Sequence, residues 1–329
     1  MSDPVRWGVL GCATIAINHV IPGILQAEGA TLTAVASRTL DKAVKVAKQF
    51  GAPKAYGSYE ALLADPEVEA VYIPLPNGLH KAWSIAAMRA GKDVLCEKPI
   101  TLNAAEAREV QAVRQETGRL TIEAFAYRFQ PLIEKAIEIA RSGRLGELQM
   151  LHTTMSFKLA LNPADVRLQA AIGGGALYDV GCYALNLQRM LVGREPRMAW
   201  CKLTWSEQFG VDVSGAGVLD YGQGLLGTFA TGFTATTSVF HIEGTKGQLV
   251  APYGTREPAG EAGLWLTVGD VTEKLMVPPA NDYMREVQDL SEAIRGTGPA
   301  RYAHEPLEAN MRVIDACFAS DRSGVVEPV

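Results

Sequence analysis

The 329-residue sequence lacks the positive charge by which proteins attract nucleic acids and anionic membranes. Its formal net charge is −5, its pI is about 5.7, and it contains no run of like charges. Partners with a dense negative charge need a positive surface field, so this composition excludes them as the expected partners. With 48% hydrophobic and 20% charged residues, the composition is that of a globular protein. We therefore expect a small-molecule substrate, with no nucleic acid and no membrane among the partners.

The sequence also lacks a cysteine pattern and a long hydrophobic run. Its five cysteines are widely spaced without a C-x-x-C pair, which argues against a disulfide framework and against a zinc site. Thiols of this kind suit a reducing compartment, so we expect a cytoplasmic protein without a bound metal. No hydrophobic run approaches the roughly 18 residues of a membrane helix, and the first residues lead directly into a strand-like segment. Export and membrane insertion are therefore not expected.

The pattern of expected strands and helices changes near residue 126, which indicates two domains. Over residues 1–125, short apolar runs alternate with helix-compatible segments, which is the pattern of a doubly wound parallel α/β sheet. Over residues 126–329, successive strand-like runs predict an α+β domain with a largely antiparallel sheet. Two late helices, 282–295 and 306–320, are expected to pack on a core. The expected strands cover residues 5–10, 31–36, 68–73, 93–96 and 120–125 in the first domain and 147–157, 197–206, 213–221, 225–233, 238–243 and 264–268 in the second.

The first expected strand runs into Gly11-Cys12-Ala13-Thr14-Ile15-Ala16, a degenerate dinucleotide-binding fingerprint. In G-x-G-x-x-G, the glycines allow a tight turn, close approach of the backbone to a pyrophosphate and close packing of a helix. Here Ala13 and Ala16 replace the second and third glycines. Strand-glycine-helix turns occur in many sheets, so the match alone is weak. Pro22 is expected to kink or end the helix that follows.

Two further loops of the first half suit a nucleotide. Ser37 and Arg38 follow the second expected strand, where an NAD site usually carries an acidic residue for the ribose 2′-hydroxyl. An arginine beside a small hydroxyl suits a 2′-phosphate and favours NADP(H), with NAD possible; the alternative is a solvated arginine at a helix start. The loop Pro74-Leu75-Pro76-Asn77, with His80 after it, gives a rigid backbone that suits a flat ring.

One lysine lies where ligands bind in sheets of this kind. The apolar run 93–96 predicts a buried strand that delivers Glu97-Lys98-Pro99 at its carboxyl end. Ligands of open α/β sheets bind beyond the carboxyl ends of the strands, so Lys98 is well placed to act on a substrate. The alternative is a surface lysine before a helix-initiating proline. The bond between Lys98 and Pro99 is a candidate for the cis form.

A second polar group lies in the other half of the chain. Gly173-Gly174-Gly175 would let the backbone approach another group closely, and the helix-compatible stretch after it places Asp179 and Tyr183 one turn apart. A carboxylate and a phenol would then project side by side. The alternative is that Asp179 stabilises a helix N-terminus and that Tyr183 is a packing residue.

Together these segments resemble the glucose-fructose oxidoreductase/inositol dehydrogenase/MocA (Gfo/Idh/MocA) family over most of the chain. The resemblance is carried by the Gly11 turn, the Pro74–His80 loop, Glu97-Lys98-Pro99, Glu123-Ala124-Phe125 with Tyr127-Arg128-Phe129, and the stretch from Gly173 to Asn186. It implies a Rossmann domain with a doubly wound parallel sheet and a C-terminal α+β domain with an open sheet. It also implies hydride transfer with NAD(H) or NADP(H), and a homodimer or homotetramer formed through the C-terminal sheet.

Tyr183 stands where inositol dehydrogenases of this family carry histidine. This departure points to the branch with glucose-fructose oxidoreductase, dimeric dihydrodiol dehydrogenase and NADP-dependent xylose dehydrogenases, in which the tyrosine is the acid/base. The resemblance thus implies an oxidoreductase that acts on a sugar CH-OH, with C1 of an aldose such as xylose or glucose as the expected position. Ketosugar reductases and dihydrodiol dehydrogenases remain alternatives, and a nucleotide sensor or an NAD-dependent glycosidase is a more distant one. The choice of sugar depends on loops such as 158–171.

The resemblance also implies roles for single residues. Tyr183 takes or returns the proton, Lys98 lowers the pKa of that phenol and polarises a carbonyl, and Asp179 orients a hydroxyl and keeps Lys98 charged. The residues expected at the sugar are Lys98, Tyr127, Asp179 and Tyr183. The residues expected at the cofactor are Gly11, Cys12, Ala13, Thr14, Ile15, Ser37, Arg38, Pro74, Leu75, Asn77, His80, Glu97, Lys98 and Arg128.

Overall fold

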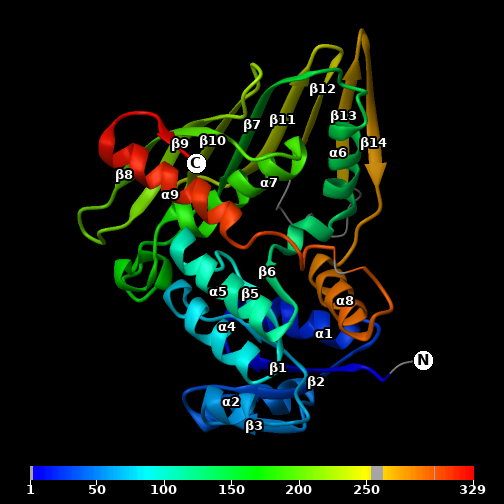
Figure 1. Cartoon of the computed structure of the whole chain (residues 1–329), viewed down its shortest axis with the longest axis vertical. Helices are drawn as coiled ribbons and strands as arrows, with labels where there is room; N and C mark the ends of the chain where they lie inside the picture. The colour runs from blue at the N-terminus through cyan, green and yellow to red at the C-terminus, as the bar shows by residue number, and fades with distance from the viewer. Residues whose placement is uncertain (1–2, 253–261, 300) are drawn as a thin grey trace. The chain divides into compact units, whose positions relative to one another are not determined.

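The computed structural model describes residues 3–252, 262–299 and 301–329. The chain folds into two compact units (Figure 1). The first comprises Met1–Phe129 and Asn281–Glu308, and the second comprises Gln130–Ala280 and Ala309–Val329. The chain first passes from one unit to the other within four residues of the expected boundary at 125/126. The return of Asn281–Glu308 to the first unit differs from the expected division, which placed this segment in the C-terminal domain.

In the described part of the first unit, six parallel strands form a sheet in the order β3-β2-β1-β4-β5-β6. This is the Rossmann order, in which the direction of sheet growth reverses between β1 and β4. The expected parallel sheet is confirmed. The short strand β3 was not anticipated, because three residues are too few to show a period. The strands are β1 (Val5–Leu10), β2 (Ala30–Ala36), β3 (Lys54–Tyr56), β4 (Ala70–Ile73), β5 (Asp93–Glu97) and β6 (Thr121–Ala124).

Short-range signals in the sequence set the ends of the connecting helices. Gly51 ends α2 with a φ of 73°, a left-handed conformation that glycine adopts without strain. Asn103 begins α5, where its side chain accepts the Glu106 N-H at 2.9 Å. A π-helical turn, η1 (Ala16–Val20), precedes Pro22, and the helical path continues past the proline. Of the two expected outcomes at Pro22, a kink or an end, the end is therefore wrong. The helices are α1 (Ile21–Gln26), α2 (Leu40–Phe50), α3 (Tyr59–Leu63), α4 (His80–Arg89) and α5 (Ala104–Thr117).

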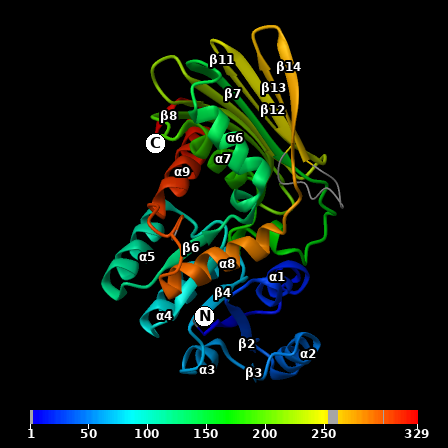
Figure 2. The same ribbon diagram turned by 90° about the vertical axis from the view of Figure 1, so that its right-hand side faces the viewer.

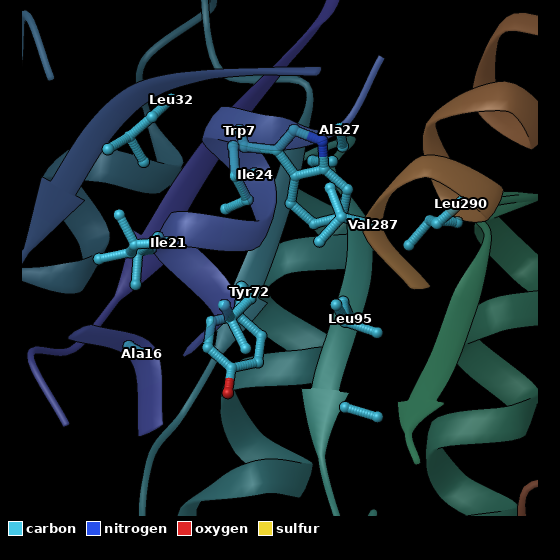
Figure 3. Close-up of a cluster of buried hydrophobic side chains, with 14 of the residues drawn as sticks. Trp7, Ala16, Ile21, Ile24, Ala27, Leu32, Tyr72, Leu95, Val287 and Leu290 are labelled. Atoms are coloured by element: carbon cyan, nitrogen blue, oxygen red, sulfur yellow. The ribbon is translucent and has the colours of Figure 1, made fainter. Parts of the chain in front are cut away.

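A hydrophobic core lies between the sheet and two helices that are distant in sequence (Figure 3). The helices are α1 and α8 (Asp282–Arg295). From the sheet, Trp7 and Tyr72 are fully buried, and α8 contributes Val287 and Leu290. The Trp7 indole N-H also donates to Ser291 Oγ on α8 at 3.0 Å. The late helix therefore packs on a core as expected, and the core it completes is that of the first unit.

Among the described residues, nine strands form the sheet of the second unit in the order β14-β13-β12-β11-β7-β10-β9-β8-β15. All neighbouring pairs are antiparallel except β7 with β10, so the expected largely antiparallel sheet is confirmed. The strands are β7 (Leu148–Ser156), β8 (Met198–Trp205), β9 (Asp212–Asp220), β10 (Leu226–Gly232), β11 (Thr237–Gly244), β12 (Gly247–Pro252), β13 (Ala262–Val268), β14 (Val271–Val277) and β15 (Glu327–Pro328).

Helices cover one face of this sheet, as Figure 2 shows for α6 (Pro131–Arg141) and α7 (Cys182–Val192). On α7, the Gln188 amide donates to Thr153 Oγ1 on β7 and to the Thr228 carbonyl on β10. On the helix α9 (Glu308–Ser323), Ser320 Oγ accepts the Cys201 N-H of β8 at 3.0 Å. Side chains on the other face alternate with these buried ones and are partly exposed. Within the described ranges, no helix is both long and apolar enough to span a membrane.

Candidate active site

The first group of predicted site residues lies in the loops that follow β1 and β4, the two strands between which the strand order of the Rossmann sheet changes direction. Gly11 ends β1 with a φ of 127°, and a Cβ there would lie 3.1 Å from Leu75 Cδ2 in the loop after β4. Only glycine adopts this conformation readily. Residues 12–15 then lead into the helical segment, in which Ala16 is fully buried. Both loops therefore lie at the carboxyl edge of the sheet, in the crevice where such sheets bind dinucleotides.

Two cations follow β2 beside this turn, Arg38 in the loop after the strand and Lys42 in the first turn of α2. Arg38 and Lys42 are exposed, and the Cys12 thiol lies 3.9 Å from the Lys42 carbonyl oxygen. Burial raises the pKa of Cys12, and the Lys42 ammonium and a hydrogen bond with Ser37 oppose this rise. Ser37 and Arg38 were predicted from the sequence, and Lys42 was not. The position of Lys42 in the first turn of α2 was the available signal, since anions bind near helix N-termini.

His80 joins two loops of the site. The ring is fully buried, with Nδ1 2.7 Å from the Pro99 carbonyl oxygen and Nε2 2.7 Å from the Leu75 carbonyl oxygen. Burial lowers the pKa of His80, and the two carbonyls oppose that effect. The structure thus shows His80 as a brace between the loop after β4 and the turn after β5. Direct contact of His80 with a cofactor stays a prediction.

Lys98 lies at the end of β5, in a turn whose backbone is held by two carboxylates. Glu97 accepts the Lys98 N-H at 3.3 Å and the Tyr72 hydroxyl at 2.6 Å. Glu123 of β6, a residue without an expected role, accepts the Ile100 N-H at 2.9 Å. The Lys98–Pro99 bond is cis, as the sequence allowed. Lys98 and Glu97 are half-buried at the carboxyl edge of the sheet, where a substrate group is expected.

Tyr127 and Arg128 lie in the 3-10 turn η3 (Ala126–Phe129), and both are buried. The Arg128 guanidinium lies over the rings of Phe125 and Tyr302, 4.8 and 4.9 Å from their centroids. It also pairs with Glu305 at 3.0 Å. These contacts give Arg128 a packing role within the first unit. Contacts of Tyr127 with a sugar and of Arg128 with a cofactor stay predictions.

In the second unit, Asp179 and Tyr183 lie on consecutive helical segments. Asp179 belongs to a π-helical turn, η6 (Leu177–Gly181), and Tyr183 to α7, which continues it. Both side chains are half-buried. Asp179 Oδ2 accepts the Nε-H of Arg167 at 2.8 Å. Arg167 comes from the loop 158–171 and was not expected in the site, because nothing in its local sequence marks it as the partner of a residue twelve positions later.

The triple glycine allows two close approaches. A Cβ at Gly174 would lie 2.7 Å from the Arg167 carbonyl oxygen, and one at Gly175 would clash with the Asp212 carboxylate. The Gly175 N-H donates to the Arg167 carbonyl at 2.9 Å. The glycines therefore let the loop that carries Arg167 fold against the helix that carries Asp179.

Asp212 is a third carboxylate that the sequence did not reveal. It lies at the start of β9, is 1% exposed, and accepts the Leu177 N-H at 2.7 Å. Burial raises the pKa of Asp212 to about 6, against the effect of the backbone donors. A carboxylate at this place satisfies an N-H at the start of the helical segment and fixes the direction of that segment.

Each unit therefore carries a different part of the predicted acid/base site. The first carries an ammonium group, Lys98, at the edge of a dinucleotide-type sheet. The second carries a carboxylate, Asp179, and a phenol, Tyr183, along one helical path. Among the described residues, no group of three or more His, Cys, Asp or Glu side chains is placed to hold a metal ion.

Known proteins match both units of the chain. A model described as an oxidoreductase family with an NAD-binding Rossmann fold matches residues 5–125, and the GFO/IDH/MocA C-terminal domain matches residues 133–250. A curated relative, D-xylose 1-dehydrogenase (NADP(+)) 2 from Haloferax volcanii, is 39% identical over 323 residues. The match covers 97% of this chain and 98% of the relative.

Two solved structures are similar over almost the full length. An aldose-aldose oxidoreductase from Caulobacter crescentus, complexed with glycerol, has a TM-score of 0.91 and 26% identity and covers 99% of this chain and 100% of its own. A 3-ketoreductase from Actinomadura kijaniata, in complex with NADP and TDP-benzene, has a TM-score of 0.89 and 29% identity and covers 97% of this chain and 98% of its own.

Proposed function

The chain belongs to the Gfo/Idh/MocA oxidoreductase family, and we propose that it transfers hydride between a sugar CH-OH group and NADP(H). In this proposal the reacting position is C1 of an aldose such as xylose or glucose. The observation that carries it is the 39% identity to a D-xylose 1-dehydrogenase over nearly the whole of both chains. Tyr183, which replaces the histidine of inositol dehydrogenases, supports the same branch.

The first unit fits a nicotinamide dinucleotide. The left-handed turn at Gly11 and the buried Ala16 leave room for a pyrophosphate between the loops after β1 and β4. Residues 11–15 would hold the pyrophosphate, and the loop 74–77 would line the nicotinamide. The cations of Arg38 and Lys42 would hold a 2′-phosphate, which favours NADP over NAD.

The bound nicotinamide supplies or accepts the hydride, and residues of the chain manage the proton. Tyr183 takes the proton from the sugar hydroxyl during oxidation and returns it during reduction. A phenol titrates at about 10, so it needs a nearby cation to act near neutral pH. We assign that cation to Lys98, which also stabilises negative charge on the carbonyl oxygen. Asp179, oriented by Arg167 at 2.8 Å, accepts a hydrogen bond from a substrate hydroxyl.

The two central residues can be tested separately from cofactor binding. Tyr183→Phe and Lys98→Met are each expected to lower kcat by about a hundredfold or more, as for loss of general acid/base catalysis. Binding of NADPH, followed by nicotinamide fluorescence, should be retained in both variants. Tyr178→Phe is the matched control, since Tyr178 lies in the same stretch and packs on Phe318. Turnover close to that of the wild type in either variant would remove that residue from the mechanism.

A ketosugar reductase is the second candidate. The likeness to a 3-ketoreductase whose structure holds NADP favours it, with 29% identity over 97% of this chain. The same residues would serve, because the reverse reaction needs a proton donor and a polarised carbonyl. Oxidation of NADPH by a ketosugar, without reduction of NADP⁺ by any aldose, would select this candidate.

We also propose an assembly and a compartment. The uncovered face of the second sheet exposes large apolar side chains on separate strands, and we propose that a homodimer or homotetramer forms there. These side chains are Met150, Trp200, Leu226 and Trp265. A monomeric mass in light scattering would contradict this assembly. The five cysteines are buried thiols outside disulfide bonds, which is consistent with the reducing cytoplasm.

A further inference from the structure

A buried carboxylate that has no place in the mechanism above lies in the first unit. Glu286 of α8 is 1% exposed, and neither of its carboxylate oxygens has a hydrogen-bond partner in the described part of the chain. An ionised carboxylate without a partner is costly to bury, whereas a neutral carboxylic acid is far less so. The surroundings of Glu286 therefore decide which form is present.

Taken together, the charged groups around Glu286 oppose its ionisation. They are Glu97 on β5, Arg128 on η3, and Asp282 and Asp289 on α8 itself. Three carboxylates thus face it against one cation, and that cation already pairs with Glu305 at 3.0 Å. Tyr72 of β4, which is uncharged in its ordinary state, interacts electrostatically with Glu286 and with Tyr283 of α8. Tyr283 is stacked on His19 of η1. Burial and Glu97 raise the pKa of Glu286 well above its ordinary value.

Glu97 has the opposite surroundings. It is half-buried, and it accepts hydrogen bonds from the Tyr72 hydroxyl at 2.6 Å and from the Lys98 N-H at 3.3 Å. Donors of this kind favour the ionised carboxylate. Burial and the Glu97 carboxylate raise the pKa of Tyr72, so the phenol remains a donor. Two nearby carboxyl groups are therefore driven into different protonation states, with the charge on Glu97 and the proton on Glu286.

We propose that Glu286 is a positioning residue, a neutral carboxylic acid behind Glu97 that keeps the Glu97–Lys98 turn in its working geometry. The inference rests on the proposed function, because the position of Lys98 matters only if its ammonium group acts on the substrate. Neutral Glu286 adds no second negative charge near Glu97. Glu97 can then keep both of its donors, and the Lys98 backbone stays fixed.

The first measurement concerns the proton and needs no substrate. An infrared difference spectrum, wild type minus Glu286→Gln at neutral pH, should contain the C=O stretch of a protonated carboxylic acid. Glu292→Gln, on the same helix and bonded to Gln288 at 2.8 Å, is the control and should not remove that band. If the difference contains only carboxylate bands, Glu286 is ionised and the proposal is overturned.

The second measurement concerns positioning. Glu286→Ala should lower kcat about tenfold or more by loosening the turn, with NADPH affinity retained. Glu286→Gln, a neutral isostere, should restore kcat to within about twofold of the wild type. Full kcat in Glu286→Ala, or a Gln variant as impaired as the Ala variant, would overturn the positioning role. If the wild type itself turns over no sugar, the proposed function fails, and the infrared result still decides the state of Glu286.

Discussion

At the scale of single residues, the pair formed by Arg167 and Asp179 explains how a carboxylate is kept oriented. The side chains are 42% and 15% exposed, so the pair is only partly removed from solvent. Exposed ion pairs contribute about 0–1 kcal/mol to stability, and we expect no more here. The role of Arg167 is therefore directional. Its Nε-H fixes Asp179 Oδ2, and the triple glycine holds the loop that carries it.

Replacing Arg167 should therefore affect activity more than folding. For Arg167→Gln we expect kcat to fall about tenfold or more, because a misplaced carboxylate costs catalytic geometry. The thermal midpoint should move by no more than a few degrees, and NADPH binding should be unchanged. Arg194→Gln, which removes a guanidinium bonded to Gln223 in the same unit, is the matched control. An unchanged kcat in Arg167→Gln would show that this ion pair has no part in orienting Asp179.

The cofactor preference also belongs to single residues. Arg38→Ala should raise the KM for NADP⁺ about tenfold or more while changing that for NAD⁺ little, since only NADP⁺ carries the 2′-phosphate. Adding Lys42→Ala should extend the effect. Lys45→Ala, an exposed lysine one turn further along α2, serves as the control. If the ratio of the two KM values in Arg38→Ala equals that of the wild type, the assignment of Arg38 to the 2′-phosphate is wrong.

At the scale of elements, one strand residue determines how a helix begins. Asp212 of β9 is buried against the first turn of η6, and its pKa is raised to about 6. A carboxyl group whose folded pKa lies above its unfolded value, 3.8 here, stabilises the protonated folded state. The contribution of Asp212 to stability is therefore greatest below about pH 4. It decreases as the pH rises to about 6.

Asp212→Asn should remove this pH dependence, because an amide accepts the Leu177 N-H without titrating. The stability of the wild type relative to the variant should fall by about 2 kcal/mol between pH 4 and pH 7. Urea unfolding of both proteins at the two pH values measures this difference. Asp220→Asn, at the far end of β9, is the control and should follow the wild type. Parallel curves for the wild type and Asp212→Asn would contradict the assignment.

At the scale of the whole molecule, the sequence predicted what depends on neighbours along the chain. Alternating apolar runs predicted the strands, and the helix ends at Gly51 and Asn103 likewise depend on residues close in sequence. The Lys98 turn and the Asp179–Tyr183 spacing could be predicted too, because they also depend on residues close together in the sequence. The family resemblance supplied their roles, which local patterns alone left open.

Features that depend on tertiary packing were not predictable in this way. Arg167 meets Asp179, and Asp212 meets Leu177, only after the second unit has folded. Glu286 looks like an ordinary polar position of an amphipathic helix until α8 packs in the first unit. From the sequence, α8 was assigned to the C-terminal domain, because it follows the strands of that domain along the chain. No local pattern shows that a segment returns to an earlier unit.

The central claim is that this chain oxidises an aldose with NADP⁺ and that Tyr183 carries the proton. The most direct test follows nicotinamide absorbance for the wild type and Tyr183→Phe, with NADP⁺ and NAD⁺, against a panel of aldopentoses and aldohexoses. We expect the wild type to reduce NADP⁺ with at least one aldose and Tyr183→Phe to lose that activity. Equal rates in the two proteins, or no reduction of either cofactor by any aldose, would contradict the account.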